Sequence, residues 1–117
     1  MIFECQLYNM KNILNFIGKS GTVYKFHVHP WPYSFKIRQG GIFLFTKFLH
    51  DNFHVPICLG VTANLATQFI NKYELENINE DSPTHICVCT EDNESKREFA
   101  EEDLSEIAQR LPDFHVL

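Results

Sequence analysis

The chain lacks a long apolar run and an export signal. None of the apolar segments in its 117 residues approaches the length of about 20 residues that a helix needs to cross a bilayer. The stretch Met1–Cys5 shows no basic region followed by an apolar one, which a secretory signal would contain. We therefore expect a soluble, cytoplasmic protein that does not use a membrane as its partner.

Glycine, proline and cysteine are also scarce, with five, five and four copies. Hydrophobic residues make up 44% of the chain and eleven are Phe, which excludes a disordered chain. We expect one domain, residues 1–117, with its own core. Such a core needs no disulfides, so we expect reduced thiols and buried cysteines. Cys87 and Cys89 are too closely spaced for half of a usual zinc site.

Positive charge is in short supply, and it is unevenly distributed. The net charge is -5, with six Lys/Arg against two Asp/Glu in residues 1–60 and four against thirteen in residues 61–117. A nucleic-acid-binding protein usually carries a basic stripe. The balance therefore disfavours nucleic acid. It favours either a solvated acidic helix or an acidic face for a basic protein partner.

Apolar periodicity predicts four strands and two helices. Residues 22–29 alternate as a half-buried strand does, and residues 41–47, 55–60 and 84–90 are strand-like apolar runs. Residues 63–73 and 95–111 have helical spacing. The segment before residue 20 fits either a helix or a strand. We expect an α+β fold, with a small, mainly antiparallel sheet of three to four strands flanked by helices and with residues 41–47 and 55–60 as neighbours.

Three segments, in order, carry a family resemblance. Residues 41–43 read Gly-Ile-Phe, and residues 58–60 read Cys-Leu-Gly before a strand-to-helix turn at 61–65. A glutamate-bearing helix follows from residue 97. Over residues 18–112 this order resembles the GIY-YIG nuclease superfamily. The resemblance implies a GIY-YIG-like fold and metal-assisted phosphodiester hydrolysis, in which tyrosines activate water, an arginine binds the phosphate and a glutamate holds a divalent cation.

The positions that matter for this chemistry are mostly changed. Phe43 and Cys58 stand where the family has tyrosines, and Gln68 stands where it has the arginine. The glutamate corresponds to Glu101, with Glu102 as the competing alignment. The resemblance implies that Phe43, Cys58, Gln68 and Glu101 converge in one cluster, and a Glu101 on the opposite sheet face from Phe43 would contradict the alignment.

These changes favour a catalytically degenerate domain. Our leading hypothesis is a binding or assembly module for a protein partner, without a cofactor and without catalytic residues. The alternative is a divergent endonuclease that uses Mg²⁺ or Mn²⁺ on Glu101 and a substitute base, either His85 or Tyr24. The oligomeric state and the biological process stay open.

A second alternative is a small metal- or thiol-dependent protein. Such a site would be built on Cys87, Cys89 and histidines, for example with His85, Cys87 and His27 turned to one side, or on the strand pair His27 and His29. A nucleophilic Cys58 would need His54 or His85 beside it. Buried cysteines and solvent-facing histidines are the commoner outcome for these residue types.

One segment combines aromatic and basic side chains. Trp31, Tyr33 and Phe35 alternate and would share one side of an extended chain, with Lys36 and Arg38 beside them. Such a set could stack nucleic-acid bases, contact a protein or enter the core. Because the whole chain is acidic, we favour a protein contact or the core over nucleic acid.

Overall fold

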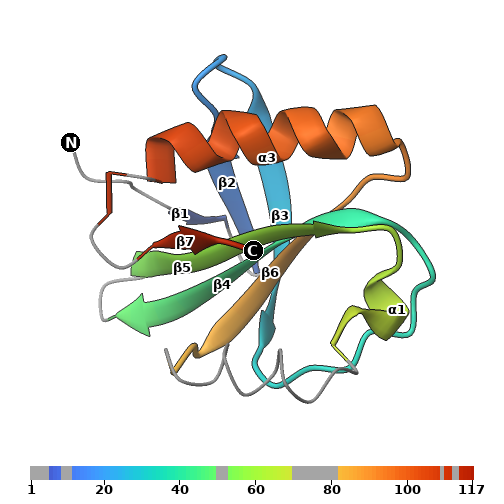
Figure 1. Cartoon of the computed structure of the whole chain (residues 1–117). Coiled ribbons are helices and arrows are strands. Elements are labelled where there is room, and N and C mark those ends of the chain that lie inside the picture. The colour runs from blue at the N-terminus through green and yellow to red at the C-terminus, as the bar shows by residue number, and fades with distance from the viewer. Residues whose placement is uncertain (1–5, 9–11, 50–52, 70–81, 109, 112–113) are drawn as a thin grey trace.

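The computed structural model describes residues 6–8, 12–49, 53–69, 82–108, 110–111 and 114–117 (Figure 1). Its strands are β1 (Gln6–Tyr8), β2 (Ile13–Ile17), β3 (Val23–Pro30), β4 (Gly41–Leu49), β5 (Phe53–Thr62), β6 (His85–Thr90) and β7 (His115–Val116). Its helices are α1 (Leu65–Gln68) and α3 (Glu94–Ala108). No described helix is long and apolar enough to cross a membrane.

All of these strands belong to one sheet, in the order β1-β2-β3-β6-β4-β5-β7. Every neighbouring pair is antiparallel except β5 and β7, which are parallel. The sheet curls, because β1 comes back against β5 although four strands lie between them in the sheet (Figure 1). The α+β class and the mainly antiparallel sheet are confirmed. The expected number of three to four strands is wrong, since the described chain forms seven, five of them with five residues or more.

The four expected strands lie where periodicity placed them, as β3, β4, β5 and β6, and the predicted neighbours β4 and β5 pair along their length. The described part of the ambiguous N-terminal segment is a hairpin, β1–β2. In β2 the alternate residues Leu14 and Phe16 are fully buried whereas Ile17 is exposed. The two-residue period of a strand, not a helical period, therefore governs this segment.

The expected helix at 95–111 is confirmed as α3, which ends earlier, at Ala108. The expected helix at 63–73 begins as the single turn α1, and residues 70–73 lie outside the described part. Asn64 caps this turn, because its side-chain oxygen accepts a hydrogen bond from the backbone N–H of Ala66 at 3.0 Å.

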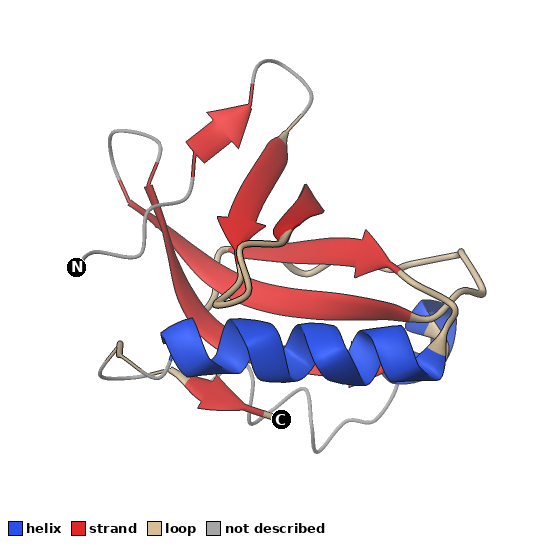
Figure 2. Ribbon diagram, turned by 90° about the horizontal axis from the view of Figure 1, so that it is seen from above, coloured by secondary structure: helices blue, strands red, loops and turns tan. Residues whose placement is uncertain are grey.

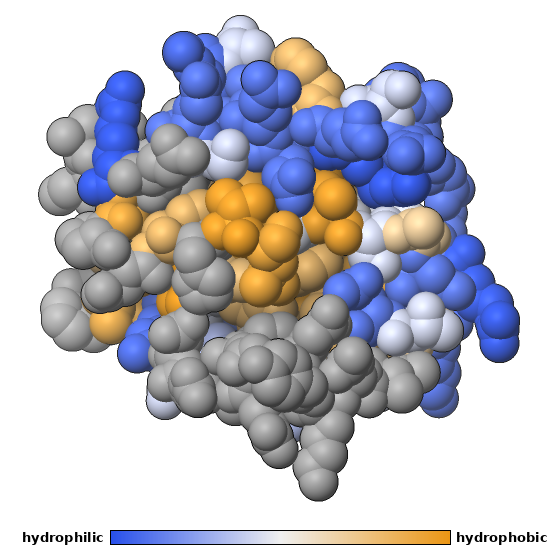
Figure 3. Space-filling view, viewed as in Figure 1, coloured by the Kyte–Doolittle hydropathy of each residue, from blue (hydrophilic) through white to orange (hydrophobic). Residues whose placement is uncertain are grey.

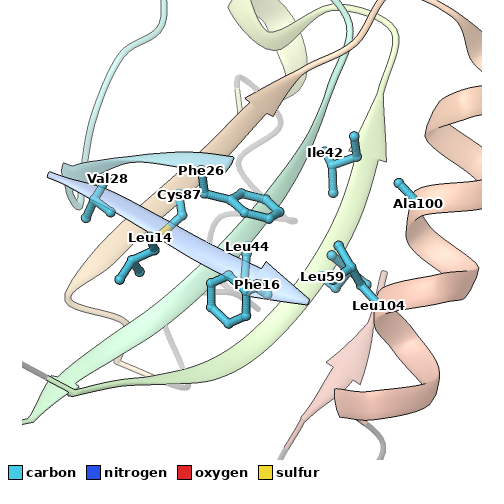
Figure 4. Packing of buried hydrophobic residues seen from close by; sticks show 10 residues of the cluster. All are labelled: Leu14, Phe16, Phe26, Val28, Ile42, Leu44, Leu59, Cys87, Ala100 and Leu104. Carbon is cyan, nitrogen blue, oxygen red and sulfur yellow. The ribbon is translucent and has the colours of Figure 1, made fainter. Parts of the chain in front are cut away.

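Helix α3 covers one face of the sheet and closes the first core over it (Figure 2). We call this the helix-side core. Ala100 and Leu104 point from α3 toward Ile42 and Leu59 of the sheet (Figure 4). Its buried members are Leu14, Phe16, Phe26, Val28, Ile42, Leu44, Leu59, Cys87, Ala100 and Leu104.

The opposite face of the sheet carries a second core, made largely of rings. We call it the aromatic core. Its buried members are Phe35, Phe43, Phe45, Ile57, Cys58, Leu65, Ile86 and Val88, with Trp31 and Phe69 packed against them. The Phe43 ring meets the Phe69 ring edge to face at 5.1 Å, and Trp31 meets Phe45 at 4.8 Å. These are favourable aromatic geometries.

Two glycines of the motif-like segments have packing reasons of their own. Gly60 lies directly opposite Phe43 across the β4–β5 ladder, and a Cβ at Gly60 would overlap the Phe43 ring. A Cβ at Gly41 would lie 2.8 Å from the carbonyl oxygen of Cys89. Both positions thus require glycine whether or not the chain descends from a nuclease.

The contact between Gly60 and Phe43 predicts a paired mutational effect. Gly60→Ala should destabilise the protein by about 1–3 kcal/mol, because the added methyl overpacks the ring. In a Phe43→Leu background the same change should cost less, since leucine leaves room for the methyl. Urea unfolding of the wild type, both single variants and the double variant measures this difference. If Gly60→Ala lowered the free energy of unfolding equally in both backgrounds, the contact with Phe43 would not be the reason for a glycine at position 60.

Candidate functional site

Phe43 and Cys58, the first two positions named by the family resemblance, lie inside the aromatic core. Phe43 and Cys58 are each 1% exposed. Gln68 is partly buried at the end of α1, one residue before Phe69, whose ring packs on Phe43. Phe43 and Cys58 therefore share one face of the sheet, and α1 brings Gln68 near them.

Glu101 does not join them. It lies on α3, whose Ala100 and Leu104 pack on the opposite face of the sheet. The expectation that Phe43, Cys58, Gln68 and Glu101 form one cluster is therefore wrong. The competing residue, Glu102, lies on the same helix. The physical reason is the alternation along β4, which turns residue 43 away from the face that α3 covers.

Of the two substitute bases, Tyr24 is not suited to replace the missing tyrosines. The Tyr24 hydroxyl donates a hydrogen bond to Asp103 Oδ2 at 2.8 Å, and burial together with this carboxylate raises the pKa of Tyr24 to about 12. A group with this pKa remains protonated at neutral pH. Burial lowers the pKa of His85, and its Nδ1 lies 2.8 Å from the Thr84 hydroxyl.

The aromatic and basic segment divides between core and surface. Phe35 is 8% exposed and Trp31 is half-buried, and both pack in the aromatic core. Tyr33, Lys36 and Arg38 are exposed, and the Tyr33 ring stacks on His29 at 4.2 Å. Trp31 and Phe35 are therefore core residues rather than a base-stacking platform, while the other three are available at the surface.

The cysteine and histidine combinations considered from sequence do not assemble. Cys58 belongs to the aromatic core, whereas His54 bonds to Thr46 on the helix side. A register shift in the β4–β5 ladder after Phe45 causes this separation, since it turns two successive β5 residues toward the aromatic core. Cys58 is therefore a buried core residue, as we expected, and is not paired with His54.

The remaining metal candidates are also divided between the two faces. Phe26 and Val28 enter the helix-side core, so alternation places His27 on the other face, away from Cys87. Burial raises the pKa of Cys87 to about 12, which keeps the thiol protonated. Within the described ranges, no three His, Cys, Asp or Glu side chains are grouped so that they could hold a metal ion.

A buried polar cluster at the far end of the strands escaped the sequence analysis. His54 is 2% exposed, and its Nδ1 lies 2.8 Å from the hydroxyl of the fully buried Thr46. The rings of His54 and His85 meet edge to face at 5.0 Å. Burial, with a smaller contribution from His85, lowers the pKa of His54 to about 4. No sequence pattern indicated this pair, because Thr46 follows a continuous apolar run and the buried His54 lies between the exposed Phe53 and Val55.

A second network, around Asp103, anchors the β2–β3 turn to α3. The Asp103 carboxylate accepts hydrogen bonds from the Ser20 backbone N–H and hydroxyl, both at 2.7 Å, and from Tyr24. Burial alone would raise the pKa of Asp103, but these hydrogen bonds lower it. A Cβ on Gly18 would collide with the same carboxylate. Residues 18–21 are therefore a docked turn rather than a phosphate-binding loop.

The β5/β7 edge of the sheet exposes apolar side chains. β7 pairs with β5 at Cys58 and Leu59, and no other described strand pairs with the outer edge of β5. Apolar surface gathers over this edge beneath α3 (Figure 3). Val116 and Leu117 are 39% and 55% exposed, while Val61 and Phe114 are partly buried. We call Val61, Phe114, Val116 and Leu117 the edge patch.

An acidic flank of α3 faces the β5 side of the molecule. Asp103 fixes one flank of the helix toward β2 and β3, and helical geometry places Glu98 and Glu101 on the other. Glu101 is half-buried, and burial followed by repulsion from Glu98 raises its pKa. These two carboxylates thus lie close together on the flank of α3 that faces β5.

Comparison with known proteins assigns no family. No protein-family model, no curated protein and no solved structure matches the chain.

The buried histidine predicts how stability depends on pH. In the native protein the pKa of His54 is about 4, below its ordinary value of 6.5. The unfolded chain therefore takes up the proton first, and the contribution of His54 is lost as pH falls from about 6.5 to 4, by up to about 3 kcal/mol. His54→Gln, which can keep a hydrogen bond to Thr46, should flatten this loss.

Urea unfolding at pH 7.5, 6 and 5 measures this loss of stability for the wild type, for His54→Gln and for the control His27→Gln. The control alters an exposed histidine. The control should follow the wild-type pH profile. Parallel profiles for the wild type and His54→Gln would contradict the proposed role of burial.

Proposed function

We propose that this domain is a non-catalytic protein-binding module that adds an extended segment of a basic protein to its β5/β7 edge. The proposal is carried by two observations, the exposed apolar edge patch and the neighbouring carboxylates Glu98 and Glu101 on the β5 side of α3. The proposal does not depend on a GIY-YIG-like scaffold. The pairing of the strands that begin with Gly41 and end near Gly60 supports such a scaffold, but Glu101 lies on the opposite sheet face from Phe43, which contradicts the alignment.

An open strand edge can bind a segment of another protein through main-chain hydrogen bonds. Natural proteins usually protect such an edge with charge, proline or a covering element. Here Pro56, which has no backbone N–H, and the approach of β1 protect part of β5, and β7 pairs with only two of its ten residues. The side chains that adjoin β7 are apolar. Strand addition combines main-chain affinity with pockets for alternate side chains. The edge patch supplies the apolar contacts on one side of such a strand.

Charge defines the partner. Helix α3 carries six acidic residues against Lys96 and Arg97. A strand on the edge patch would run below Glu98 and Glu101, whose mutual repulsion a cationic side chain would relieve. We therefore propose a partner segment that alternates apolar and basic residues. A cytoplasmic location agrees with the buried Cys87, which the described structure keeps as a thiol.

The partner's chemistry can be tested with a defined peptide. A ten-residue peptide of alternating Val and Lys should bind and shift the backbone NMR signals of β5 and β7, while one of alternating Val and Glu should bind at least about tenfold more weakly. Leu117→Glu should weaken binding of the Val-Lys peptide by breaking up the edge patch. The control Ile17→Glu changes an equally exposed apolar residue, 58% against 55%, on β2.

Three outcomes would contradict this proposal. They are equal affinity for the two peptides, signal shifts confined to other strands, and equal weakening by Leu117→Glu and Ile17→Glu. Self-association of the wild type that Leu117→Glu abolishes, without peptide binding, would instead assign the edge to a second copy of the chain.

The endonuclease alternative is tested separately. We expect no cleavage of single- or double-stranded DNA or RNA with Mg²⁺ or Mn²⁺, because Glu101 lies on the opposite sheet face from Phe43 and Gln68 brings no positive charge to a phosphate. The wild type and Glu101→Ala should be equally inactive over a long incubation. Wild-type cleavage that Glu101→Ala abolishes would establish the metal-dependent endonuclease instead.

A further inference from the structure

A hollow opens where strands β3 and β6 separate. The two strands pair from His27 opposite Val88 to Pro30 opposite His85. The residues of β3 before His27 pair only with β2, and the residues of β6 after Val88 pair only with β4. Helix α3 crosses the gap and leaves a cavity of about 350 Å³ beneath it. Small-molecule sites typically begin at about 300 Å³.

The cavity has an apolar interior. Ile42 and Ala100 line its base, and both belong to the helix-side core. Tyr24 and Cys89 stand on the two separating strands, and Phe99 closes the cavity from α3. Phe99 is 53% exposed although it is a large apolar residue. A ligand bound in the cavity would cover this exposed ring and remove it from water.

The walls are held in place before any ligand arrives. Tyr24 is fixed through its hydroxyl by Asp103, which also binds Ser20. The neighbouring end of α3 is fixed by Arg97, whose guanidinium donates to the backbone carbonyls of Glu91 and Asp92 at 3.0 and 2.8 Å. A site with fixed walls loses little free energy to ordering when it binds.

Charges at the rim define the class of ligand. Glu91 and Lys96 both line the opening, one carboxylate and one ammonium, so the rim has no net preference for an ion. The rings of Tyr24 and Phe99 offer faces to a planar group. We infer that this cavity, which we call the Phe99 cavity, binds a small, uncharged, mainly apolar molecule with an aromatic ring.

The probe for this inference is N-phenyl-1-naphthylamine, which is uncharged at neutral pH and fluoresces in apolar surroundings. The wild type should bind one molecule with an increase in emission. Phe99→Ala should weaken binding about tenfold, because the covering ring is lost. The control Phe48→Ala removes another exposed phenylalanine, 40% exposed, from outside the cavity and should bind as the wild type does.

Two further measurements locate the probe and test the ligand class. Bound probe should slow the alkylation of the half-buried Cys89 by N-ethylmaleimide, followed by mass spectrometry of its peptide. 2-Naphthalenemethanol should displace the probe better than 2-naphthoate or 2-naphthylmethylamine. Unchanged binding in Phe99→Ala, unprotected Cys89, or displacement led by a charged analogue would each overturn the inference. Leu117→Glu should not affect this binding, so the cavity and the edge patch are tested independently.

Discussion

Strand β4 is buried on both faces, and this constraint organises the rest of the molecule. Its residues from Gly41 to Thr46 are all buried, so each face of the sheet needs its own cover. Helix α3 supplies one cover, and the rings around Phe43 supply the other. Gly60 makes the second possible, because only a residue without a Cβ leaves room for the Phe43 ring.

The same constraint explains why Phe43, Cys58 and Glu101 do not form one site. A catalytic tyrosine would have to reach water and substrate, whereas Phe43 lies at the centre of an apolar cluster and Glu101 lies on the helix that covers the other face. Replacing a hydroxyl with an apolar ring removes a group that would need a hydrogen-bond partner when buried. Cys58 is buried beside Phe43, so this position also carries no tyrosine hydroxyl that would need a hydrogen-bond partner. The aromatic core gains packing at the place where a catalytic cleft would need solvent.

Local patterns predicted much of the fold but little of the site. The strand expected at 22–29 is β3, Val23–Pro30, because alternation is a local property of the chain. The short strand β7 was not predicted, because it forms by pairing with β5, and the paired residues Cys58 and His115 lie far apart in the sequence. Alternation shows which residues share a face of a strand, but not which face a later helix covers, so the side of Glu101 could not be predicted. Asp103 and Ser20 are 83 residues apart, and no spacing rule joins them.

Helix α3 has a different task on each of its sides, and Asp103 sets which side is which. Turning the helix by one residue, about 100°, would withdraw Asp103 from Ser20 and take Ala100 and Leu104 out of the core. The helix therefore has one stable orientation. In that orientation Phe99 closes a cavity toward β3, while Glu101 lies above the β5/β7 edge. The acidic residues Glu98 and Glu101 thus lie on the side of the helix that faces β5, whereas Asp103 lies on the side that faces β2 and β3.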